Sequence, residues 1–374
     1  MLHYALGYFY EKGKNAARAE DEYKLGAKED PAFVFPHRVE EIAVLRAAIE
    51  KNPQDGRAFY YLGNALASKE RAEEASKAWR AAVRLDPGNG VAHRNLALAL
   101  RKAGEKEDAA AEYRRAIQTA PDDFHLYLEL GELLPAGHAI AVLEGAPAQV
   151  RSLPAVVQAL AAALVDAGRY ADGAAMLDKT QFVSGEGERG ALQIFRQAHL
   201  GLAQEYRKAG QHAHAAAEFL RTTEYPHNFG VGRPAMESQA REFVSAAREF
   251  EAAGERSEAE QQWRRAAEDP LKSPTDPGEP WSENYYFKAL ALEHVHRKTE
   301  ADALYKRLAA LSDDQRMLAA EASPPHGAIR YVLAGVALKA LGQSEQARAA
   351  LERALQMDPE NELAKTAARD LRQR

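Results

Sequence analysis

The sequence predicts an all-α fold, an α-solenoid in which antiparallel helix pairs stack into a right-handed superhelix. Residues 56–89 and residues 90–123 carry the same pattern of residue types, offset by 34 positions. Apolar residues recur in both at spacings of three and four, which places them on one stripe of a helix. Glycine or proline follows where a helix has to end. Because one pair cannot bury its stripe alone, consecutive pairs have to stack.

Each recurring place within the repeat has a packing reason. A small residue at the eighth position, Gly63 or Ala97, lets the second helix of the pair approach closely. A large residue at position 24, Trp79 or Tyr113, fills the space between the two helices. Gly104 ends the first helix of its pair, since glycine readily adopts the left-handed conformation of a helix end. This pattern is similar to that of the tetratricopeptide repeat family.

The pattern also indicates where further elements lie along the chain. It recurs at Tyr331–Pro359 and at the start of the chain, where the opening helix is expected to be truncated. Pro36–Pro53 predicts a lone second helix, and Phe124–Leu134 a first helix whose partner is interrupted at Pro135 and Gly137. Weaker pairs are expected over residues 154–179, 191–225, 237–270 and 282–311, with a capping helix over residues 361–371. We expect a single solenoid over residues 1–374, made of N-terminal repeats (1–147), central repeats with inserted loops (148–270) and C-terminal repeats with the cap (271–374).

Four insertions interrupt the repeat rhythm, and they are rich in glycine, proline or aromatic residues. They span residues 32–38, 181–190, 225–236 and 269–281. The first three resemble stretches in the C-terminal repeat region of large bacterial proteins that begin with an uncharacterised domain expected to be β-rich. That resemblance implies a missing N-terminal domain as a partner, and it implies no reaction. Insertions in solenoids often gather on the face that binds.

Bulk properties exclude several classes of function. The formal net charge of −6, from 49 basic and 55 acidic residues, gives no basic footprint for nucleic acid. There are no cysteines, so disulfides and thiolate metal sites are excluded. No apolar stretch is long enough to span a membrane, and no signal peptide is recognisable, so we expect the chain in the cytoplasm. Paired histidines such as His212 and His214 have the wrong spacing for a metal site, and no catalytic motif is present. We therefore expect no enzyme activity, no metal and no cofactor.

The first helices of the two clearest repeats offer a set of groove positions for a partner. The tetratricopeptide resemblance implies a concave groove lined by these positions. A chaperone-binding groove would carry a clamp for a C-terminal carboxylate, but only its two asparagine places are matched here, and Glu129 would repel a carboxylate. A solvated helix face is the alternative to a binding groove. The groove residues predicted to contact a partner are Arg57, Tyr60, Asn64, Arg94, Asn95, Arg101 and His125.

The inserted loops supply the second set of candidate binding residues. Gly230 to Pro234 does not form a phosphate loop, because no Gly-Lys-Ser/Thr helix start follows it. Arg233 is instead suited to pair with a carboxylate on a partner, unless the loop is only a connector. Trp281 either stacks on a ligand or fills a gap in the packing. The loop residues predicted to dock a partner are Glu186, Glu188, Asn228, Arg233 and Trp281.

The sequence thus predicts a non-catalytic scaffold that holds a peptide or a partner domain by its groove and inserted loops. The alternative is the accessory C-terminal part of a larger bacterial enzyme, for example a carbohydrate-active one, whose catalytic domain is missing here.

Overall fold

A computed structural model describes the chain except for residues 30–33, 183–187, 235–236, 272–281, 313–323 and 373–374. The described residues form helices joined by short turns and contain no strand, which confirms the predicted all-α class. They divide into two compact units, residues 1–167 and residues 168–374, each of which is described by itself below. The three-part division expected from the sequence stays a prediction.

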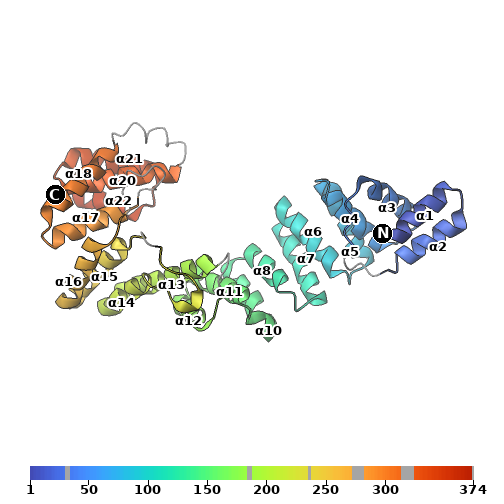
Figure 1. The fold of residues 1–374 in the computed structure, drawn as a ribbon, viewed down its shortest axis with the longest axis horizontal. Helices are drawn as coiled ribbons and strands as arrows, with labels where there is room; N and C mark the ends of the chain where they lie inside the picture. The colour runs from blue at the N-terminus through green and yellow to red at the C-terminus, as the bar shows by residue number, and fades with distance from the viewer. Residues whose placement is uncertain (30–33, 183–187, 235–236, 272–281, 313–323, 373–374) are drawn as a thin grey trace. The chain divides into compact units, whose positions relative to one another are not determined.

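The first unit is a succession of helix pairs, coloured from blue to green in Figure 1. The lone helix predicted after the first pair is present as α3, which packs against α1 and α4. The helices of this unit are α1 (Leu2–Lys12), α2 (Ala16–Gly26), α3 (Val39–Lys51), α4 (Gly56–Ala67), α5 (Ala72–Leu85), α6 (Gly90–Ala103), α7 (Lys106–Thr119), α8 (Phe124–Leu133), α9 (Ala136–Glu144), α10 (Ala148–Arg151) and α11 (Pro154–Asp166).

The predicted interruption after α8 is wrong. Pro135 is the N-cap of α9, and Gly137 lies in its first turn. Proline is compatible with a helix start, where the first N–H groups have no partner within the helix. As a result α9 packs against α8 as a regular partner, and α11 packs against α9 in turn.

The second unit continues the paired arrangement and ends in the predicted cap. Helix α22 packs against both α20 and α21 and so covers the last pair. Its elements are α12 (Tyr170–Lys179), α13 (Glu188–Lys208), α14 (His212–Arg221), η1 (His227–Phe229), α15 (Ala240–Ala253), α16 (Arg256–Glu268), α17 (Asn284–His294), α18 (Lys298–Ala309), η2 (Ala310–Ser312), α20 (Pro324–Ala340), α21 (Ser344–Met357) and α22 (Glu362–Arg372).

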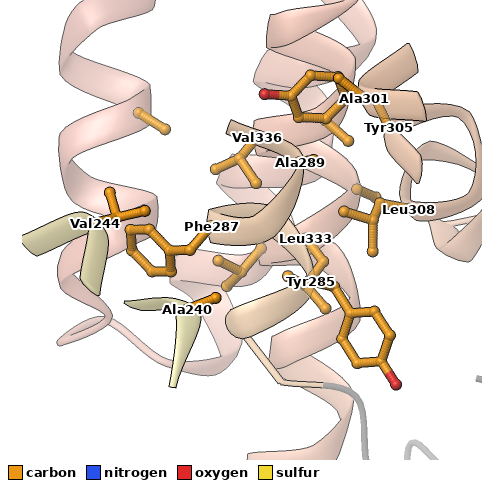
Figure 2. Packing of buried hydrophobic residues seen from close by; sticks show 14 of the residues in the cluster. Ala240, Val244, Tyr285, Phe287, Ala289, Ala301, Tyr305, Leu308, Leu333 and Val336 are labelled. Atoms are coloured by element: carbon orange, nitrogen blue, oxygen red, sulfur yellow. The ribbon is translucent and has the colours of Figure 1, made fainter. Parts of the chain in front are cut away.

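The core of the second unit joins side chains from several successive helices. Figure 2 shows Phe287 of α17 beside Val244 and Ala240 of α15. Tyr305 of α18 and Leu333 of α20 belong to the same cluster, and all five side chains are buried. Each helix therefore buries a stripe between its neighbours on both sides, which is how a stack of pairs acquires one continuous core.

The close approach within each pair has the cause that the sequence predicted. A Cβ atom on Gly63 would lie 2.4 Å from the Trp79 ring, so α4 and α5 meet at this glycine. Gly7 meets the Tyr23 ring in the same way in α1 and α2, at 2.6 Å. Gly104 ends α6 in the left-handed conformation with φ of 83°, as expected for a glycine at a helix end.

Candidate partner-binding site

A groove of about 1150 Å³ lies between α4, α5 and α6 in the first unit. Its lining includes small and aliphatic side chains such as Ala67, Ala75, Leu98 and Ala99. The groove is open along one side, and charged side chains, among them Glu73 and Lys102, stand on its walls. It therefore offers an apolar floor with a polar rim, which is the usual composition of a polypeptide-binding surface.

Two of the predicted groove residues meet in this groove and bond to each other. Asn64 Oδ1 accepts one hydrogen bond from Asn95 Nδ2 and another from Trp79 Nε1, each at 3.0 Å. Among the described residues, no partner takes the Asn64 Nδ2 donors or the Asn95 Oδ1 acceptor. The pair thus presents a donor and an acceptor side by side, which complements the C=O and N–H groups of a peptide.

The predicted cationic residues of α6 are neutralised within the first unit. Arg94 forms a two-pronged ion pair with Glu129 of α8, with Nε to Oε2 at 3.0 Å and Nη2 to Oε1 at 2.5 Å. The hydrogen bond to Glu129 raises the pKa of Arg94 above its ordinary value. Arg101 pairs with Glu132, also on α8, at 3.2 Å. These two arginines therefore link neighbouring first helices.

The other predicted groove residues lie apart from the Asn64–Asn95 pair. Tyr60 is only 6% exposed and packs in the core, 5.4 Å from the ring of Tyr61. Arg57 is half-buried, and its Nη1 atom has no hydrogen-bond partner in the part of the chain that the structure describes. His125 is exposed at the start of α8, where its Nδ1 atom lies 3.0 Å from Asp123 Oδ1. None of these three lines the groove.

Asn228, from the segment between α14 and α15, is engaged inside the second unit. Its side-chain Nδ2 group donates to Leu177 O and Thr180 O, both at 2.8 Å, and its backbone carbonyl accepts from Phe182 N at 2.8 Å. The adjacent Phe229 is fully buried. Asn228 therefore fastens this insertion to the end of α12.

Arg233 finds a carboxylate within its own chain. Its Nη2 atom lies 3.2 Å from Asp269 Oδ1 and 3.0 Å from Glu237 O. Of the remaining loop candidates, Glu186 and Trp281 lie outside the described residues, and Glu188 is the first residue of α13. A docking role for these loop residues stays a prediction.

A second, smaller pocket was not predicted from the sequence. It has a volume of about 340 Å³ and lies in the second unit between α13, α14, α15 and residues 237–239. Polar side chains dominate its lining, including Gln193, Gln197 and Gln204 of α13 and Glu242 of α15. The sequence did contain an indication of this pocket, because the three glutamines recur at spacings of four and seven and therefore lie on one face of a helix.

The described residues contain no helix long and apolar enough to cross a membrane. Family models for the tetratricopeptide repeat match residues 42–89, 70–124 and 329–361. No protein of curated function matches the sequence.

Several solved repeat structures are similar to the chain at low identity. One from Parabacteroides merdae is 15% identical, with a TM-score of 0.34, over 78% of this chain and all of that one (100%). The C-terminal part of a repeat-containing protein from Cytophaga hutchinsonii is 13% identical, with a TM-score of 0.41, over 73% of this chain and 96% of that one. YrrB, a repeat protein described as having an unusual peptide-binding site, is 15% identical, with a TM-score of 0.36, over 48% of this chain and 90% of that one.

Proposed function

We propose that this chain, an array of tetratricopeptide repeats, is a non-catalytic scaffold that holds a partner polypeptide in the groove between α4, α5 and α6. The observation that carries the proposal is the Asn64–Asn95 pair, which leaves a donor and an acceptor directed to the same groove. A peptide group has one C=O acceptor and one N–H donor, so it can bond to such a donor and acceptor at the same time. The inserted loops of the second unit are proposed as further docking surface.

The composition of the groove defines the kind of segment it takes. The charged side chains that line the groove are balanced, with Glu70, Glu73 and Glu105 against Lys77, Arg80 and Lys102, so its lining has no net charge to select an acidic or a basic peptide. The floor around Leu98 and Ala99 favours aliphatic side chains, since burying apolar area on both partners is the main source of affinity. We therefore propose a ligand with an apolar segment whose main chain bonds to the two asparagines.

The test is binding of blocked decapeptides with random sequence to the immobilised full-length chain. Leu98→Arg places a charge on the groove floor and is expected to lower the retention of aliphatic-rich peptides by about tenfold or more. Val91→Arg is the matched control, because Val91 is 56% exposed on the same helix and does not line the groove. Equal retention by the wild type and Leu98→Arg would rule out this groove as the binding site.

The alternative, an accessory part of a larger enzyme, stays a prediction. No feature of the described residues favours it over the scaffold, and in that case the inserted loops would complete an active site on a missing domain of the same protein.

A further inference from the structure

The polar pocket of the second unit is built partly from repeat helices and partly from an insertion. Helix α13 supplies one wall, α15 another, and Glu237 from the segment before α15 closes one end. Arg196 holds that end in place, because its Nη1 atom bonds to Glu237 Oε1 at 2.9 Å and its guanidinium lies 4.9 Å from the centre of the Tyr225 ring. The insertion therefore shapes a site that regular repeats would not have.

The α13 wall carries a row of exposed side chains that contribute no hydrogen bond or ion pair within the described residues. Gln193, Gln197, Leu200 and Gln204 follow one another at spacings of four, three and four, and all four are exposed. No hydrogen bond engages the three carboxamides within the described residues. Each carboxamide offers one acceptor and two donors, so the row matches the repeating C=O and N–H groups of an extended polypeptide. Leu200, 39% exposed between them, offers an apolar contact.

The charges around the pocket are paired, with one exception. Arg207 lies 2.5 Å from Glu249, Arg241 lies 3.2 Å from Glu283, and Arg196 is bonded to Glu237. The remaining lining charge is Glu242, with which no described side chain forms a hydrogen bond or an ion pair.

Glu242 is also partly shielded from water. Burial raises the pKa of its carboxyl, against the opposing effects of its own backbone N–H and of the nearby Arg241 and Arg196. A carboxylate that water screens only in part gains more from an incoming cation than a fully exposed one does.

We propose that this pocket binds an extended polypeptide segment, with the α13 glutamines on its main chain and Glu242 on one lysine or arginine side chain. The site takes a ligand of different chemistry from the apolar groove of the first unit, and it does not depend on that groove. An acidic residue at the same place would meet the Glu242 carboxylate and be disfavoured. Each of the three arginines lining the pocket is paired with a glutamate, which offsets its repulsion of that cation.

The experiment uses four pools of blocked decapeptides, random except for one fixed central residue: arginine, lysine, citrulline or glutamate. Citrulline matches arginine in shape and has no charge. Retention of each pool is measured on the immobilised full-length chain carrying Leu98→Arg, which removes the contribution of the first groove. We expect the arginine and lysine pools to be retained about tenfold more than the other two, the value of one charge-assisted hydrogen bond.

Two variants separate the parts of the proposal, with a third as control. Glu242→Gln is expected to abolish the preference for arginine and lysine, whereas Glu258→Gln, an exposed charge on α16, is expected to leave it unchanged. Replacing Gln193, Gln197 and Gln204 with alanine is expected to lower the retention of all four pools by a similar factor. Equal retention of the four pools by the parent chain, or a basic preference that survives Glu242→Gln, would overturn the assignment. If Leu98→Arg did not lower the retention of aliphatic-rich peptides, only the binding role of the first groove would be ruled out. The proposal for the polar pocket would be unaffected.

Discussion

At the scale of single residues, the Asp269 carboxylate anchors the segment between α14 and α15. It accepts hydrogen bonds from Ser238 Oγ at 2.7 Å, from Gln239 N at 2.6 Å and from the Arg233 guanidinium at 3.2 Å. Asp269 is only 4% exposed, so these donors replace the water that a carboxylate otherwise requires. Together with the Asn228 and Arg196 contacts, this side chain fixes the insertion and, with it, one end of the polar pocket.

We expect Asp269→Asn to destabilise the chain by about 2–3 kcal/mol, since it removes the charge that three donors share, among them the buried Gln239 N–H. The free energy of unfolding in urea, followed by tryptophan fluorescence, measures the loss, and proteolysis should reach residues 225–239 sooner. Asp178→Asn is the control, because Asp178 pairs with Arg221 at a side-chain exposure of 43% and should cost less than about 1 kcal/mol. Equal losses in the two variants would contradict the anchoring role.

At the scale of helix pairs, one hydrogen bond between a histidine and a glutamate recurs between the two helices of a pair. His93 Nδ1 lies 2.5 Å from Glu112, His199 Nδ1 lies 2.5 Å from Glu218, and His3 Nδ1 lies 2.6 Å from Glu22, with the partners 19 residues apart each time. Other repeats hold an aromatic residue at the first place and an uncharged residue at the second. Such pairs are Phe59 with Ala78, Phe243 with Gln262, and Tyr331 with Ala350. The two places thus change together along the chain.

This covariation predicts that His93 and Glu112 are energetically coupled. We expect His93→Phe and Glu112→Ala each to cost about 1–3 kcal/mol, because each leaves a buried polar partner behind. The double variant has the residue pair already used at Phe59 and Ala78, so its loss should be smaller than the sum by about 1 kcal/mol or more. A double-mutant cycle of urea unfolding tests this, and strictly additive losses would contradict the coupling.

The eighth position of the repeat gives a second prediction for helix pairs. Gly63→Ala should cost about 1–3 kcal/mol, because its new methyl group would overlap the Trp79 ring and force α4 and α5 apart. Gly131 has the same place in α8, but a Cβ there would lie 3.6 Å from Leu143, an ordinary contact. Gly131→Ala should therefore be neutral or stabilising, since alanine is the better helix former. Thermal unfolding distinguishes the two, and equal midpoints would show that the close approach is not rigid.

At the scale of the whole molecule, local packing was predictable and contacts between repeats were not. The 34-residue spacing predicted the Gly63–Trp79 approach because both residues belong to one pair. It did not predict that Arg94 and Glu129 would meet, since they come from successive repeats and their pairing depends on how the repeats stack. Tyr60 was predicted to line the groove but is buried, and its burial likewise depends on how the repeats stack. Pro135 was predicted to interrupt a helix, but it precedes the first residue of α9. Proline is compatible with a helix start and not with a helix interior, and the sequence alone did not show that α8 ends before Pro135.

Because each helix pair buries its apolar stripe against the next element, we expect α22 to affect the stability and solubility of the whole chain. Ala364, Ala367 and Leu371 of α22 are buried against the preceding pair, whereas the opposite face carries charged residues. Removing residues 361–374 would expose the apolar stripe of α20 and α21, and terminal caps keep repeat arrays soluble. We expect the shortened chain to self-associate and to unfold at a lower temperature, as measured by light scattering and thermal denaturation. Arg369→Ser, on the exposed face of α22, should change neither quantity; a shortened chain that behaves like this control would show that α22 does not act as a cap.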